Sequence, residues 1–264
     1  MAASDAISSP GRQRQPPSLR ALLDAHFMRR QASQLKMASL TSAVAAATPE
    51  AIAPAAAAAP ATGWVAYTSW SNQSGTPITS FESTWIVPPV PVTKSGQIVY
   101  LFNSLEIPEL HILQPVLLWG TVSDVPGSGD FWTIASWWVG KTDKPFHLTE
   151  LIPVNPGERL TGRITMYRQE GPLYDYTCEF VGRTGTKLLA GNLPQLTDCT
   201  ETLEAYNITS DSDYPDTDQT SFSAISLQTG AAPAQFTWTR GGEFPPNVAP
   251  DGREVQIVYP RGEA

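Results

Sequence analysis

The feature that most constrains the fold is a regular succession of short apolar runs, separated by turn residues, that begins at Gly63. The runs are rich in β-branched and aromatic residues, which are typical of strands. Turn sequences such as NPGE at 155–158 separate them, because proline and glycine supply the dihedral angles of tight turns. One stretch, 198–208, fits either a strand or a helical turn. Strands at this spacing with almost no helix predict an all-β fold, built as two packed antiparallel sheets or a barrel.

The first 62 residues differ in composition from the rest of the chain. All eight tryptophans and all eight tyrosines lie at or after Trp64, and the first 62 residues contain one aromatic residue, Phe27. Between Ser18 and Leu40, leucine, phenylalanine and methionine recur at helical spacing. The Ala/Pro-rich tract that follows has too few large side chains to build a core and is typical of a linker. We therefore expect a flexible tail with one short helix over residues 1–62, and one β-sandwich domain over residues 63–264.

Charge is distributed unevenly along the chain. The formal net charge is −8, but residues 1–62 hold six Lys/Arg and three Asp/Glu, so that the tail carries +3 and the remainder −11. The acidic domain argues against a nucleic-acid partner, because such binding depends on Lys and Arg that neutralise phosphates. No run approaches the about 20 apolar residues of a membrane span. The acidic domain favours an extracellular setting, although no standard secretory signal is visible at Met1.

The two cysteines and the acidic residues give no metal signature. Cys178 and Cys199 flank predicted strands, and they could form a disulfide worth about 3 kcal/mol in the chain-entropy model or remain two buried free thiols. Two cysteines cannot supply a Cys/His set with zinc spacing. The acidic loop from Asp211 to Asp218 lacks the glycine and terminal glutamate of a calcium loop. We expect no metal and no cofactor.

Three predicted strands between Ile98 and Val139 combine polar and aromatic side chains. Successive side chains of a strand point to opposite faces of the sheet. The alternation defines three groups, each on one side of its strand: Tyr100, Phe102, Ser104 and Glu106; Ile112, Gln114 and Val116; Trp132, Ile134, Ser136 and Trp138. Polar groups set among aromatic rings suit the floor of a binding cleft. They equally suit a sandwich core whose polar residues are hydrogen-bonded.

Four segments carry a resemblance to a known family: STWIVPPVP at 83–91, HILQP at 111–115, SWWV at 136–139 and CTETLEAY at 199–206. Together they resemble the eqolisin, or glutamic peptidase, family. The resemblance implies a concanavalin A-like β-sandwich of the jelly-roll type and an acid-active endopeptidase. In that family a glutamine and a glutamate on the cleft floor form the catalytic dyad. The glutamate acts as general base on a water, and the glutamine amide helps to stabilise the tetrahedral oxyanion.

The resemblance places the family's glutamine on Gln114. The family's glutamate precedes a pair of aromatic residues, and by that match its position is taken by Ser136, which stands before Trp137 and Trp138. Glu106 would correspond to an acidic residue near the cleft. A serine hydroxyl with no base beside it cannot take a proton from water, and no G-x-S-x-G motif surrounds Ser136.

Two hypotheses follow. In the first, the protein is a non-catalytic member of this fold whose cleft binds a carbohydrate or an extended peptide, since tryptophan rings offer flat apolar faces. Its ligand-binding residues would be Gln114, Ser136, Glu106, Trp119, Trp132 and Trp138. In the second, the protein is an acid endopeptidase or another hydrolase, in which Gln114 works with Glu106 as a substitute carboxylate. The sequence does not predict the oligomeric state.

Overall fold

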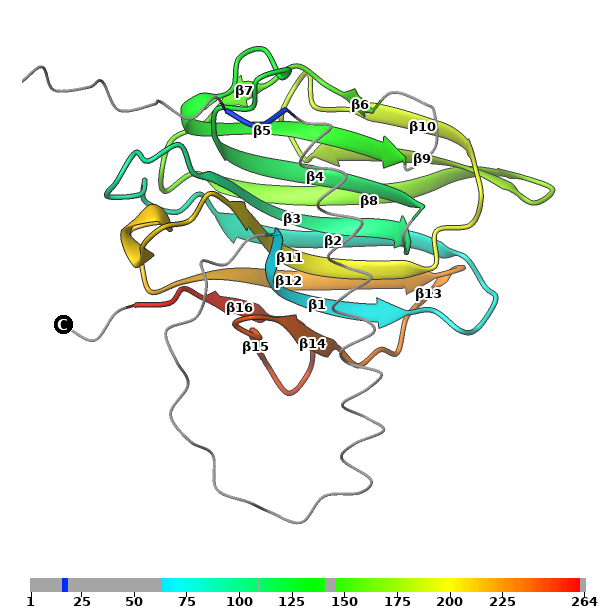
Figure 1. The fold of residues 1–264 in the computed structure, drawn as a ribbon. Helices are drawn as coiled ribbons and strands as arrows, with labels where there is room; N and C mark the ends of the chain where they lie inside the picture. Colours follow the sequence, from blue (N-terminus) through cyan, green and yellow to red (C-terminus); the bar gives the residue numbers. More distant parts are fainter. Residues whose placement is uncertain (1–15, 19–62, 109, 141–145, 262–264) are drawn as a thin grey trace, which may run out of the picture.

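The computed structural model describes residues 16–18, 63–108, 110–140 and 146–261, which fold into two antiparallel sheets packed face to face (Figure 1). This arrangement confirms the prediction of an all-β, two-sheet sandwich. The helix expected over residues 18–40 and the Ala/Pro-rich linker lie outside the described residues. No helix in the described part of the chain is long and apolar enough to cross a membrane.

The first sheet, called sheet A here, contains eight strands. Their order is β14 (Thr239–Gly242), β1 (Gly63–Ser71), β11 (Asp198–Tyr206), β3 (Ile98–Ile107), β4 (His111–Gly120), β5 (Gly129–Gly140) and β6 (His147–Leu148), with β7 (Ile152–Pro153) also paired to β5. The stretch that fitted either a strand or a helical turn is therefore a strand. It is inserted between β1 and β3 at the centre of the sheet.

The second sheet, sheet B, also contains eight strands. Their order is β10 (Leu188–Leu193), β9 (Leu173–Phe180), β8 (Arg159–Glu170), β2 (Ile78–Ile86), β12 (Gln219–Thr229), β16 (Val255–Val258) and β15 (Asn247–Val248), with β13 (Ala232–Pro233) paired to β12. A 3-10 turn, η1 (Asp211–Asp213), precedes β12. The buried side chain of Asp213 accepts hydrogen bonds from Thr93, Ser95 and Thr209. These hydroxyl groups therefore tie the acidic loop to the connection between β2 and β3.

Sheet A has two different faces. One face packs on sheet B and forms the main core, which includes Trp85, Trp119 and Trp132. The opposite face, called the distal face here, carries a second apolar cluster built only from sheet A and the loops beside it. Its members are Trp64, Tyr67, Ile98, Tyr100, Phe102, Ile112, Val116, Leu118, Val122, Val125, Ala135, Trp137, Val139 and Tyr206. Partly buried Phe146, Leu148 and Leu151 pack against this cluster from the connection after β5.

Both cysteines are free thiols in the main core, so the disulfide alternative is wrong. Cys178 lies on β9 of sheet B and Cys199 on β11 of sheet A, and both are fully buried. Burial raises the pKa of each thiol. Because the thiolate is the reactive form, both groups behave as small apolar side chains.

The two sheets pack closely around Gly162 on β8. A Cβ atom at this position would lie 2.4 Å from Asn103 Oδ1 and 2.6 Å from Pro115 Cγ. We therefore expect Gly162→Ala to lower the free energy of unfolding by about 1–3 kcal/mol, the usual cost of overpacking, in a urea titration. Gly191→Ala, on the exposed edge strand β10, is the control and should change stability by less than about 0.5 kcal/mol. Equal effects of the two substitutions would contradict the close approach of the sheets.

Candidate functional site

Gln114 lies in the middle of the distal face, on the central strand β4. It shares this face with Ile112 and Val116, as the alternation predicts, because Pro115 introduces no bulge. The register with β3 is the same before and after Pro115, with Phe102 opposite Val116 and Leu105 opposite Leu113. Gln114 therefore stands opposite Ser104. Its side chain is 6% exposed, and its Oε1 atom has no hydrogen-bond partner among the described residues.

A pair of acidic side chains lies beside this glutamine. Glu106 is two residues beyond Ser104 on the same face of β3, so it is a diagonal neighbour of Gln114, with Cα atoms about 7–8 Å apart. Asp198 on β11 stands directly opposite Glu106. The exposed fractions of Glu106 and Asp198 are 1% and 6%. An amide and two carboxyl groups are therefore gathered within side-chain reach.

Hydroxyl groups position this acidic pair. The Ser71 hydroxyl donates to Asp198 Oδ1, and the Thr197 hydroxyl donates to Asp198 Oδ2 at 2.8 Å. On the next row of the sheet, the hydroxyl oxygens of Ser104 and Thr200 are 2.6 Å apart. Two carboxylates directly opposite each other repel when both are ionised. The hydroxyl groups around Asp198 therefore place hydrogen-bond donors beside this pair.

Ser136 does not belong to this site. It pairs with Pro115 across β4 and β5 and shares its side of β5 with Ile134 and Trp138, which lie in the main core. Its hydroxyl faces the Cys178 thiol of sheet B. The alternation within β5 was predicted correctly, but the assignment of Ser136 to the same cleft floor as Gln114 is wrong, because the two residues point to opposite faces of sheet A.

The tryptophans predicted to bind ligand are also on the core side. Trp119 and Trp132 are each 1% exposed, and their ring centroids are 5.4 Å apart inside the sandwich. Both rings are buried in the main core, so the structure does not bring them to the face that carries Gln114. The tryptophan of β5 that does reach the distal face is Trp137, whose ring meets Tyr100 edge to face at 5.8 Å.

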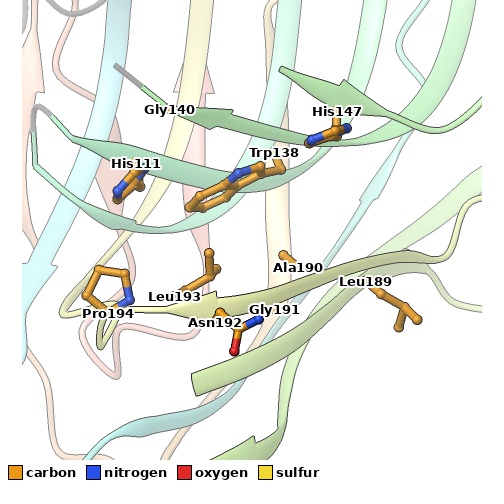
Figure 2. Close-up of a pocket in the computed structure, with 10 residues that line it drawn as sticks. All are labelled: His111, Trp138, Gly140, His147, Leu189, Ala190, Gly191, Asn192, Leu193 and Pro194. Carbon is orange, nitrogen blue, oxygen red and sulfur yellow. The ribbon is translucent and has the colours of Figure 1, made fainter. Parts of the chain in front are cut away.

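Trp138, by contrast, borders a cavity of about 340 Å³ between the edges of the two sheets. Figure 2 shows Trp138 with His111 and His147 on the sheet A side and residues 189–194 of the β10 segment facing them. The rings of His111 and Trp138 stack at 4.9 Å and 22°. The cavity is on the core side of sheet A, so it is separate from Gln114 and Glu106.

Glu204 is a second polar group on the distal face that was not predicted from the sequence. This residue lies on β11 opposite Trp64 of β1 and Tyr100 of β3, and it is 5% exposed. The Tyr206 hydroxyl donates to Glu204 Oε1. The signal was present in CTETLEAY, where Thr200, Thr202 and Glu204 alternate with apolar residues or Glu201. This alternation assigns Glu204 to a sheet face only if the stretch is a strand, and the sequence fitted a helical turn equally well.

The described residues contain no group of three or more His, Cys, Asp or Glu side chains that could hold a metal ion. On the distal face, the polar groups beside Gln114 include the carboxyl groups of Glu106 and Asp198. The arrangement offers a carboxylate that can move a proton and an amide that can donate to an oxyanion.

Comparisons with known proteins support the fold. No protein-family model matches the chain, and no curated protein matches it. Among solved structures, scytalido-glutamic peptidase with a transition state analog inhibitor aligns with a TM-score of 0.51 and 12% identity, covering 75% of this chain and 98% of that one. The same peptidase with a peptide based transition state analog gives a TM-score of 0.49 and 13% identity, over 74% and 98% of the two chains. The chain thus has an eqolisin-like β-sandwich fold.

Proposed function

We propose that this protein is a peptide hydrolase of the acid-active type, in which Gln114 and Glu106 carry the reaction. The observation that supports the proposal is their position as diagonal neighbours on one face of sheet A, with Asp198 opposite Glu106. The non-catalytic alternative takes Ser136 as the replacement of the catalytic base, and Ser136 lies on the core side of sheet A, away from Gln114.

The proposed reaction divides the work between the two side chains. Glu106 takes a proton from a water while the water oxygen bonds to the scissile carbonyl carbon. The side-chain N–H of Gln114 donates a hydrogen bond to the oxyanion that develops on the carbonyl oxygen. When the tetrahedral intermediate collapses, the C–N bond breaks and Glu106 returns the proton to the leaving nitrogen. Asp198, which accepts hydrogen bonds from Ser71 and Thr197, is a polar neighbour of Glu106 on the adjacent strand.

The test is hydrolysis of denatured casein between pH 2 and 5. We expect turnover by the native chain and a loss of about 10²- to 10³-fold in kcat for Gln114→Ala, the usual cost of removing one oxyanion donor. Gln228→Ala, a change at an exposed glutamine on β12, is the matched control and should leave kcat unchanged.

Absence of turnover across this pH range would reject the hydrolase proposal. The alternative is then the binding protein, with a peptide or carbohydrate ligand on the same face, and a glycan array together with a peptide array would separate these two ligands. Turnover that survives Gln114→Ala would also reject the assignment, since it would place the chemistry elsewhere.

A further inference from the structure

The carboxylate of Glu204 is surrounded by aromatic rings on the distal face. Trp64 and Tyr100 are its partners on the two neighbouring strands. The Trp64 ring lies 5.1 Å from Tyr67 and 6.0 Å from Phe102, both edge to face. Tyr100 and Tyr206 meet at 6.4 Å and 85°. A buried acid beside aromatic rings is an arrangement by which proteins bind ammonium and guanidinium groups.

A second carboxylate and a buried hydroxyl complete this group. Asp124 belongs to the β4–β5 connection, whose Val122 and Val125 pack on the distal face. Burial raises the pKa of Tyr100, and the charges of Glu204 and Asp124 raise it further. Tyr100 is 5% exposed, and within the described part of the chain its hydroxyl has no hydrogen-bond partner. It is therefore an oxygen that can accept a hydrogen bond from a bound cation.

We infer that Glu204, Asp124, Tyr100 and Trp64 form a subsite for the cationic side chain, Lys or Arg, of an extended peptide. The inference rests on the proposed function, because it names the substrate class of that site. Tyr100 and Ser104 are four residues apart on one face of β3, which is about 13 Å along the strand. A peptide lying along the strands would thus place a basic side chain about four residues from the bond held at Gln114.

Two sources could supply this cation. One is a separate peptide. The other is the chain itself, whose first 62 residues carry six Lys/Arg. Residues 16–18 lie beside the subsite, because the Ser123 amide donates to the Pro17 carbonyl oxygen at 3.2 Å, one residue before Asp124. The chemistry recognised is the same in both cases, so the experiment has one arm for each.

The experiment measures binding rather than turnover. Fluorescent decapeptides that differ only in one arginine or citrulline, with an N-methylated backbone that resists cleavage, are titrated into the full chain at pH 5.5 and followed by anisotropy. We expect the arginine peptide to bind about tenfold more tightly than the citrulline peptide. Glu204→Gln should reduce this preference to below about twofold. Glu170→Gln, at the exposed end of β8, is the matched control and should preserve it.

Retention of the full arginine preference by Glu204→Gln would overturn the inference. Because Glu204 is buried, Tyr100→Phe serves as a second variant that removes only the unpartnered hydroxyl, and it should lower the preference by about threefold. Thermal melts confirm that both variants are folded. If the native chain prefers the arginine peptide but does not hydrolyse casein, the subsite is supported and only the hydrolase proposal is rejected.

The second arm tests the chain as the source of the cation. The full chain is prepared with the six basic residues of the tail changed to glutamine: Arg12, Arg14, Arg20, Arg29, Arg30 and Lys36. If the tail occupies the subsite, this variant binds the arginine peptide about tenfold more tightly than the native chain, and the gain disappears with Glu204→Gln. Unchanged affinity assigns the subsite to separate peptides alone.

Discussion

Replacing Glu106 with glutamine is expected to lower kcat for casein hydrolysis by about 10²- to 10⁴-fold, the usual contribution of a general base. Glutamine has nearly the same shape as glutamate, so the packing of β3 between β11 and β4 is retained. It cannot accept a proton from water, because its amide has no basic oxygen at these pH values. KM should change little, since the substitution removes an interaction made only as the water attacks.

Two controls separate this role from a structural one. Ser136→Ala alters the residue that the sequence match aligned with the family's glutamate, and it should leave kcat unchanged because Ser136 faces Cys178 in the core. Asp198→Asn removes one carboxylate of the pair, and its amide oxygen can still accept a hydrogen bond from one of the two hydroxyl groups. It should not abolish activity, because Glu106 remains to act as the base. Full activity of Glu106→Gln, or loss of activity in Ser136→Ala, would contradict the assignment of the base.

The sequence predicted which residues share a face of each strand, but not which residues of neighbouring strands lie side by side. The period of two in a strand decides that Ser104 accompanies Glu106, and that Ser136 accompanies Trp138. Which residues become neighbours across strands depends on register, and a slip of one residue exchanges the faces. Pairing of Gln114 with Trp137, rather than with Ser136, therefore decides the site. No local signal in β4 or β5 specifies that register.

The acidic residues Asp198 and Glu204 lie on β11, a strand that is far from β3 in the sequence. β11 follows β3 in the chain by about ninety residues, yet it pairs with β3 along its whole length, from Asp198 opposite Glu106 to Tyr206 opposite Ile98. Long-range pairing of this kind is decided by tertiary packing rather than by local propensity. The polar alternation of Thr200, Thr202 and Glu204 was visible in the sequence, but the residues of β1 and β3 beside them were not.

The same strand places a carboxyl group in the main core, where it makes stability depend on pH. Glu201 is fully buried, and burial raises its pKa well above the ordinary value of 4.5, while a hydrogen bond from Ser83 at 3.2 Å opposes the shift. Asn103 stands directly opposite on β3. Glu201 Oε1 and Asn103 Oδ1 are both buried acceptors without a partner in the described structure. A proton on Glu201 would let its carboxyl group donate to the Asn103 oxygen.

The sign of the effect follows from linkage. Below about pH 4.5 Glu201 is protonated in both the folded and the unfolded chain, so its contribution to stability is fully present. Above that pH the unfolded chain releases the proton while the folded chain retains it. The free energy of unfolding then falls by about 1.4 kcal/mol per pH unit until the folded-state pKa is reached. Glu201 thus makes the fold more stable in acid, where the proposed reaction would run.

Glu201→Gln tests this argument because the glutamine amide donates to Asn103 Oδ1 at every pH and has no proton to lose. We expect urea titrations at pH 4 to give nearly the same free energy of unfolding for the native chain and the variant. At pH 7 the variant should be the more stable of the two by about 2–4 kcal/mol, the size of the penalty for a buried carboxyl group without a compensating charge. Glu170→Gln, at an exposed position on β8, is the control and should show no such divergence.

Parallel stability curves for Glu201→Gln and the native chain between pH 4 and 7 would contradict this prediction. They would show that Glu201 titrates at the same pH in the folded and the unfolded chain, so that it does not make stability depend on pH.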